Sequence, residues 1–166
     1  DHRVGDLDCH LGLLSDAGCP AVADPGARLV EAAHRAGVRV VPLVGPSSIL
    51  LALMGSGLNG QKFAFHGYLP IDAAQKTKEI KRLEQESKAH AQTQMFIETP
   101  YRNMQLFETL LKTLQPNTCL CVGADLTLPT ERLRTQTVGE WQKMFKNKGS
   151  EITDLNKRPT MFLFLA

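Results

Sequence analysis

The sequence lacks most of the features that would assign it to a specialised class of protein. Its 166 residues contain no apolar run close to the ~20 residues that a membrane-spanning helix requires. The first six residues, Asp1 to Asp6, lack the apolar core of a signal peptide. The formal net charge of +2 is too small to identify a nucleic-acid partner by itself. With 43% hydrophobic and 22% charged residues, the composition is that of an ordinary globular protein without a membrane partner.

Motifs for binding metals and phosphates are also missing. The four cysteines have no C-x-x-C spacing, and no cluster of His, Cys and carboxylate residues has the spacing of metal ligands. We therefore predict reduced cysteines that serve in packing rather than in a metal or disulfide role, no bound metal, and a cytoplasmic location. The patterns G-x-G-x-x-G, G-x-x-x-x-G-K-[ST] and H-E-x-x-H are absent.

The order of apolar runs and turns predicts an α/β fold with two lobes. In the first 57 residues, the apolar runs at 11–14 and 38–44 are typical of buried strands, and each leads through a turn into a helix. Strand, helix, strand, helix is the βαβ pattern of a parallel sheet, but two strands alone leave the sheet edges bare. Residues 1–57 are therefore predicted to be the incomplete remainder of a first α/β domain.

The glycine-rich stretch at residues 57–60 marks the predicted boundary to a second α/β domain, residues 58–166, with a mixed sheet. Helices in this domain are expected at residues 73–88, 101–114 and 140–145. Five strands are expected at residues 63–69, 94–98, 119–124, 132–138 and 161–165.

Three loops that follow predicted strands are candidate ligand-binding segments: residues 15–20, 45–48 and 98–102. Open parallel sheets bind ligands outside the carboxyl ends of their strands. Each loop also leads into a helix start, where free N–H groups favour a carboxylate or a phosphate. Because Gly, Pro and Ser are also the usual turn residues, spacing alone leaves a purely structural role open.

The first of these loops begins a longer signature. Residues 15–26, which begin Ser15-Asp16-Ala17-Gly18, resemble the S-D-A-G-x-P-x-x-x-D-P-G signature of the ribosomal-RNA 2′-O-methyltransferase branch of the tetrapyrrole methylases. Segments 41–48, 65–70 and 96–102 resemble the next three landmarks of that branch, in the same order. The resemblance covers nearly the whole chain. It implies two α/β domains with S-adenosylmethionine in the cleft between them, and it implies that the first strands of the family's first domain are absent from this sequence.

The resemblance also implies which residues hold the cofactor. The first loop faces the methionine end of the cofactor, and a serine pair follows the second strand. A glutamate ends a strand of the second domain, and Leu126, Pro159 and Thr160 form a wall beside the adenine. The residues that match these places are Asp16, Ala17, Gly18, Ser47, Ser48, Glu98, Leu126, Pro159 and Thr160.

The implied reaction transfers a methyl group to an oxygen, and a ribose hydroxyl would benefit from a nearby base or a polarising charge. The sequence assigns no such base, because each candidate has a structural alternative. Asp16 is placed to stabilise a turn and Asp24 to cap a helix. His66 is placed to form a hydrogen bond within a strand, and Glu98 to pair with Arg102 at a helix start. The candidates are Asp16, Asp24, His66 and Glu98.

Three functions remain open. The resemblance favours 2′-O-methylation of a ribose, with ribosomal RNA or the small ribosomal subunit as partner. A tetrapyrrole or corrinoid methyltransferase would share the fold, and a non-catalytic dimerising fragment is the third possibility. Lysines on the helix at 73–88 form a potential RNA-tracking surface, although the interleaved glutamates favour a solvated, self-paired face. We expect a homodimer, because the helix at 49–54 is apolar nearly all round.

Overall fold

The computed structural model describes residues 10–16, 18–146 and 154–166 and divides the chain into two compact units. Unit 1 is Asp1–Ser47 and unit 2 is Ser48–Ala166. This division precedes the domain boundary predicted at residue 57, because the helix that starts at Ser48 packs on the sheet of unit 2.

The described part of unit 1 contains a single helix, α1 (Ala27–Arg35). Its N-cap is Gly26, with a φ of 136° and no side-chain capping hydrogen bond. The N-cap role predicted for Asp24 is therefore wrong: the backbone enters the helix two residues later, through a conformation that favours glycine. None of the residues of α1 is buried.

The two strands expected in this unit, at 11–14 and 38–44, do not form within its described residues. Leu14 and Leu43 are 93% and 87% exposed. A strand is held by hydrogen bonds and side-chain contacts to neighbouring strands, and the described residues of unit 1 supply no such neighbours. The apolar pattern is therefore not sufficient to form a strand in this structure.

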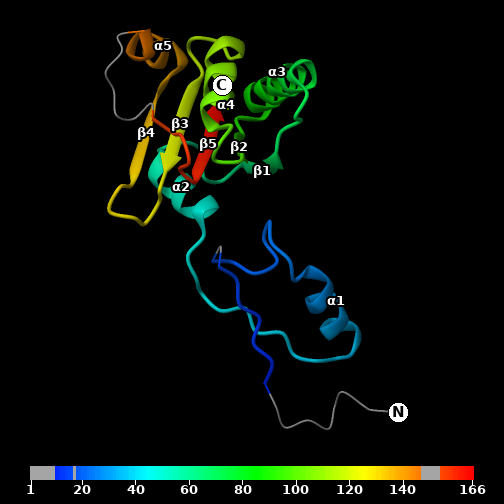
Figure 1. Cartoon of the computed structure of the whole chain (residues 1–166). Coiled ribbons are helices and arrows are strands. Elements are labelled where there is room, and N and C mark those ends of the chain that lie inside the picture. Colours follow the sequence, from blue (N-terminus) through cyan, green and yellow to red (C-terminus); the bar gives the residue numbers. More distant parts are fainter. Residues whose placement is uncertain (1–9, 17, 147–153) are drawn as a thin grey trace. The chain divides into compact units, whose positions relative to one another are not determined.

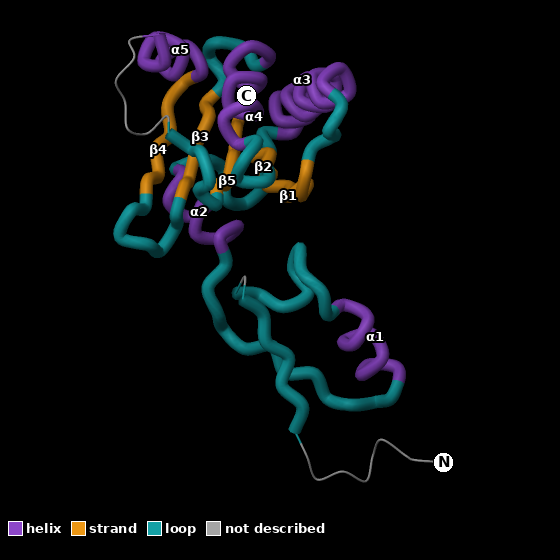
Figure 2. The backbone as a smooth tube through the Cα atoms, viewed as in Figure 1, coloured by secondary structure: helices purple, strands orange, loops and turns teal. Residues whose placement is uncertain are grey.

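Unit 2 is built on a five-stranded mixed sheet in the order β1-β2-β5-β3-β4 (Figure 2). β1 (Phe63–Tyr68) and β2 (Thr93–Ile97) are parallel. β5 (Thr160–Leu165) is antiparallel to both β2 and β3 (Cys119–Ala124), and β4 (Arg132–Thr137) is antiparallel to β3. The predicted mixed sheet is confirmed, with each strand within one residue of its expected range.

Helices cover the two faces of this sheet unequally (Figure 1). On one face lie α3 (Ala73–His90), α4 (Asn103–Thr113) and α5 (Val138–Lys146), and on the other lies α2 (Ser48–Ser56). Within the described ranges, no helix has both the length and the apolar character needed to cross a membrane.

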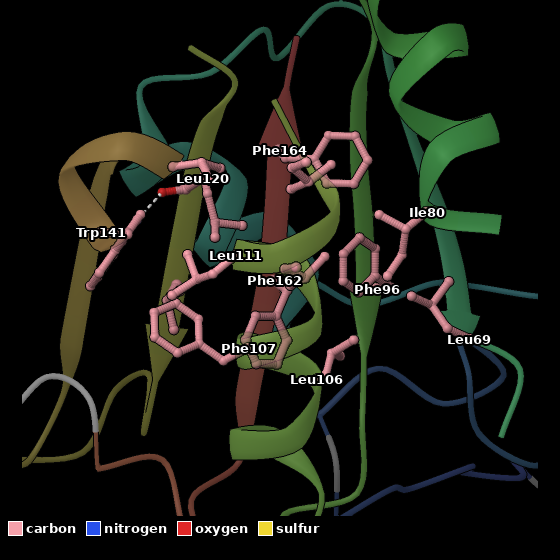
Figure 3. Close-up of a cluster of buried hydrophobic side chains, with 14 of the residues drawn as sticks. Leu69, Ile80, Phe96, Leu106, Phe107, Leu111, Leu120, Trp141, Phe162 and Phe164 are labelled. Atoms are coloured by element: carbon pink, nitrogen blue, oxygen red, sulfur yellow. Dashed lines mark hydrogen bonds between the residues drawn. The ribbon is translucent and has the colours of Figure 1, made fainter. Parts of the chain in front are cut away.

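The core of unit 2 follows the alternation of side chains along the strands. Phe96 and Phe162 come from neighbouring strands and stack with ring centroids 6.1 Å apart, on the face that α3, α4 and α5 cover (Figure 3). Leu163, one position further, belongs to the cluster beneath α2. Trp141 of α5 is fully buried, and its Nε1 donates a hydrogen bond of 2.8 Å to the carbonyl of Leu120. This packing fixes the strands and therefore the points where their loops emerge.

Candidate functional site

Several strands of unit 2 end or begin at the same edge of the sheet. Tyr68 of β1 pairs with Ile97 of β2, and Ile97 pairs with Met161 of β5. Ala124, the last residue of β3, pairs with Thr160, the first residue of β5. The carboxyl ends of β1, β2 and β3 therefore coincide with the amino end of β5, and such edges are where α/β sheets bind ligands. Four of the predicted cofactor residues adjoin these strand ends: Glu98, Leu126, Pro159 and Thr160.

The residues predicted to face the adenine are held together by an ion pair. The backbone N–H of Asp125 donates to the carbonyl of Pro159 at 3.0 Å. The carboxylate of Asp125 accepts a hydrogen bond from NH1 of Arg158 at 2.5 Å. Since Asp125 precedes Leu126 and Arg158 precedes Pro159 and Thr160, these bonds fix the turn after β3 against the segment that leads into β5.

The carboxylate of Glu98, directly after β2, is bonded on both oxygens to groups of the protein. Oε1 accepts from the backbone N–H of Thr99 at 2.8 Å, and from Nε and NH2 of Arg102 at 3.2 and 3.0 Å. Oε2 accepts from Nζ of Lys76, on the first turn of α3, at 3.3 Å. The side chains of Glu98 and Lys76 are only 1% and 5% exposed. The three residues Lys76, Glu98 and Arg102 are called the charge cluster below.

The charge cluster determines the ionisation of its carboxyl group. Burial alone would raise the pKa of Glu98, but the Thr99 amide and the cations of Lys76 and Arg102 outweigh burial and hold that pKa below its ordinary value. Glu98 is therefore ionised at neutral pH. With its oxygens already bonded inside the protein, it is better suited to positioning its partners than to accepting a proton from a substrate.

The burial of Lys76 differs from the expectation of a solvated lysine on this helix. The residues of α3 that are buried lie at positions 76, 80, 83 and 87, which is the spacing of one helical face. That spacing was visible in the sequence, but a lysine on an apolar stripe usually keeps its ammonium in water. The partner that permits burial, Glu98, lies 22 residues away and no local pattern reveals it. The pairing of Glu98 with Arg102 matches the predicted helix-start alternative.

His66 has the hydrogen bond that one of its two predicted roles requires. Its Nε2 lies 2.6 Å from the carbonyl oxygen Oε1 of Gln94, on the neighbouring strand β2, and donates to it. The contact supports the structural role. This contact does not test a role for His66 as a base.

In unit 1, Gly18 and Cys19 of the first candidate loop lie against Pro46 of the second. Sγ of Cys19 donates to the carbonyl of Pro46 at 3.3 Å. Gly18 has a φ of +107°, and a Cβ at this position would lie 2.4 Å from the same carbonyl oxygen. The positive φ and the close approach of this carbonyl both require glycine at position 18. The structure thus brings together two of the three loops selected from the sequence.

The remaining predicted residues are distributed as follows. Asp16 is exposed in the turn before Gly18, and Ala17 lies outside the described residues. Ser47 ends unit 1 and Ser48 begins α2. Among the residues with a described position, no three His, Cys, Asp or Glu side chains are grouped to hold a metal ion. The expectation that the loops of both units face one cleft stays a prediction.

A mixed sheet covered by helices on both faces, with polar loops after the carboxyl ends of its strands, defines a protein of the α/β class. The family model of the Tetrapyrrole (Corrin/Porphyrin) Methylases matches residues 11–142. The chain belongs to this family, as its sequence signature predicted.

Relatives with assigned names support the same placement. The Ribosomal RNA small subunit methyltransferase I of Mesorhizobium japonicum is 39% identical over 128 residues, which cover 77% of this chain and 42% of that protein. The protein of the same name from Escherichia coli O157:H7 is 32% identical over 142 residues, covering 84% and 48% respectively. The chain spans about half the length of the curated relatives that it matches.

A solved structure supports the fold. The methyltransferase CobJ superposes with a TM-score of 0.55 at 16% identity, covering 89% of this chain and 61% of that chain. At this identity the likeness concerns architecture alone, and it confirms the predicted fold class.

Proposed function

We propose that this chain acts in S-adenosylmethionine-dependent methylation of the 2′-oxygen of a ribose in ribosomal RNA. The observation that carries the proposal is the 39% identity over 128 residues to a protein named Ribosomal RNA small subunit methyltransferase I. The strand ends of unit 2 support it, because Glu98, Leu126, Pro159 and Thr160 adjoin them at one edge of the sheet. The proposed partner is the small ribosomal subunit or its RNA, and the proposed location is the cytoplasm.

The chain offers groups that fit such a cofactor. Leu126 is half-buried and Pro159 is exposed at the sheet edge, which gives an apolar wall suited to an adenine ring. When bound, S-adenosylmethionine supplies an electrophilic methyl group. The contribution of the protein is then to orient the acceptor hydroxyl and to exclude water.

Calorimetric titration with S-adenosylmethionine, followed by methyl transfer to small-subunit RNA, tests the proposal. We expect the purified chain to bind the cofactor, and isotopic label from its methyl group to appear on a ribose 2′-oxygen. The matched control is the same RNA with a 2′-deoxyribose at the labelled nucleotide, which should accept no methyl group. Methylation of a tetrapyrrole and not of RNA would contradict the proposed substrate.

We also propose that the chain forms a homodimer. Among the described helices of unit 2, α2 is the only one on its face of the sheet, and its Leu50 and Met54 are 51% and 79% exposed. A second copy would remove this apolar surface from water. Sedimentation should show a dimer at micromolar concentration, and Met54→Glu should shift it towards monomer. A monomeric unaltered chain would contradict the proposal.

A further inference from the structure

The charge cluster carries more positive than negative charge at the ligand-binding edge of unit 2. Lys76 and Arg102 contribute two cations, while Glu98 contributes one carboxylate. Glu98 and Lys76 are almost completely buried, so water screens their charges poorly. An excess cation in such a position attracts an anion from solution.

The guanidinium of Arg102 is held in one orientation. Nε and NH2 donate to Glu98, and Nε also donates to Oγ1 of Thr99 at 3.0 Å. Within the described part of the chain NH1 has no acceptor, and the Arg102 side chain is 35% exposed. The edge formed by NH1 and the second hydrogen of NH2 is therefore available. Its fork geometry matches the two oxygens of a phosphate.

Exposed aromatic and aliphatic side chains emerge from the same strand ends. Tyr101, next to Arg102, is 77% exposed. Tyr68 at the end of β1 is 61% exposed, and Ile71 in the loop that follows is 77% exposed. Tyr68 is the last residue of β1 and pairs with Ile97, the last residue of β2, and Tyr101 lies four residues after Ile97. Exposed rings beside a cation are the groups on which unpaired nucleobases stack.

The N-terminal half of α3 adds two lysines without carboxylate partners in the described structure. Lys78 and Lys81 are exposed, and neither has a carboxylate partner among the residues whose positions are described. Arg82, further along the same helix, differs because it pairs with Glu79 at 2.7 Å and Glu86 at 3.9 Å. The self-pairing expected for this helix thus holds for Arg82 but not for the two lysines.

We propose that Arg102 binds a phosphodiester of single-stranded RNA, that Glu98 and Lys76 position its guanidinium, and that Tyr101 stacks on an adjacent base. This subsite rests on the proposed function for the identity of the polymer, and it assigns residues that recognise it. A flexible RNA strand fits the combination of an oriented cation, exposed rings and unpaired lysines better than an acidic protein segment, which would use the charges alone.

The test is the salt dependence of RNA binding, measured by fluorescence anisotropy with a short unstructured oligoribonucleotide. Arg102→Ala should weaken binding at least about tenfold and lower the slope of log K against log salt by about 0.7, the value for one lost phosphate contact on a single strand. Arg82→Ala removes the same charge elsewhere on unit 2 and should change affinity less than about twofold. Tyr101→Ala should weaken binding about fivefold or more, with the salt slope retained.

Two further measurements separate this proposal from its alternatives. Arg102→Lys keeps the charge and a partner for Glu98, so it should fold normally, retain the salt slope and bind RNA with intermediate affinity. In Arg102→Ala, affinity for S-adenosylmethionine measured without RNA should fall by a smaller factor than affinity for RNA. A loss of cofactor affinity as large as the loss of RNA affinity would overturn the subsite.

The possible failures are distinguishable. If folded Arg102→Ala and Arg102→Lys bind RNA with unaltered affinity and salt slope, the subsite is wrong, while methyl transfer to RNA still decides the proposed function. If the unaltered chain binds an acidic peptide but no RNA, both proposals are overturned.

Discussion

Units 1 and 2 contain similar apolar runs, but only the runs of unit 2 form strands and are buried in the described structure. In unit 2, Phe162 and Leu163 of β5 are fully buried between neighbouring strands. In unit 1, Leu43 lies in a run of comparable character and is 87% exposed, and α1 has no buried residue. Burial in unit 2 comes from strands and helices contributed by distant parts of the chain. The comparison shows that an apolar run becomes a strand only where partners exist to pair with it.

The largest difference between the units in the free energy of unfolding is expected when a large apolar side chain is removed from each. Phe162→Ala empties a fully buried site that stacks on Phe96, and should lower the free energy of unfolding by about 3–5 kcal/mol. Leu43→Ala, in unit 1, should change it by less than about 0.5 kcal/mol. Urea denaturation followed by far-ultraviolet circular dichroism measures both. Equal costs for the two substitutions would remove the distinction between the units.

A slightly smaller difference in stability is expected between breaking the buried ion pair of unit 2 and breaking an exposed ion pair of unit 1. Glu98→Gln leaves the ammonium of Lys76 buried without a carboxylate and should cost about 3 kcal/mol. Adding Lys76→Met should restore part of that loss. Glu31→Gln in unit 1 breaks a pair with Arg35 whose side chains are 56% and 77% exposed, and should cost less than about 0.5 kcal/mol. The same denaturation experiment applies, and a neutral Glu98→Gln would contradict the burial argument.

The stabilisation contributed by the ionised Glu98 should be lost at acidic pH. Because the folded-state pKa of Glu98 is held below its ordinary value of about 4.3, the unfolded chain takes up the proton first as pH falls. The stabilisation is therefore complete above that value and is lost as pH falls through the folded-state pKa. Urea midpoints measured between neutral and acidic pH should fall more steeply for the unaltered chain than for Glu98→Gln. Parallel curves would show that Glu98 has no such role.

The smallest predicted effect concerns the affinity for S-adenosylmethionine and the two serines at which unit 1 ends and unit 2 begins. Replacing Ser47 and Ser48 with valine should weaken S-adenosylmethionine binding at least about tenfold, because losing a buried polar partner costs about 1–3 kcal/mol. If the serines only start α2, the variant should lose thermal stability and keep its affinity. Calorimetry and a melting curve on the same variant distinguish the two results.

The strands and helices of unit 2 were predictable from short apolar runs bounded by turns and from apolar residues at helical spacing. Residues 119–124 are a continuous apolar run and form a strand where expected. Residues 38–44 show an equally apolar run but lack neighbours in the described structure. A pattern reports what one segment can bury, whereas formation of a sheet depends on several segments at once.

The loop at 98–102 could be chosen from the sequence because a strand followed by a turn and a helix start marks the ligand-binding edge of an α/β sheet. The loops at 15–20 and 45–48 were chosen on the same ground, but the segments before them form no strand in the described structure. Binding of the cofactor by these loops stays a prediction. The bond between Lys76 and Glu98 could not be predicted, because it joins residues on separate elements. The cap assigned to Asp24 was wrong, since a good capping residue does not determine where the backbone enters the helix.

The chain contains one tryptophan, and its position makes it a selective optical reporter. The indole of Trp141 is fully buried edge-to-face against Phe107, with ring centroids 5.3 Å apart. Indole emission moves to longer wavelength when the ring passes from an apolar site into water. Tryptophan fluorescence of this chain therefore follows the release of α5 from the sheet and is blind to events confined to unit 1. A spectral change on adding a ligand to the loops of unit 1 would mean that unit 2 has responded as well.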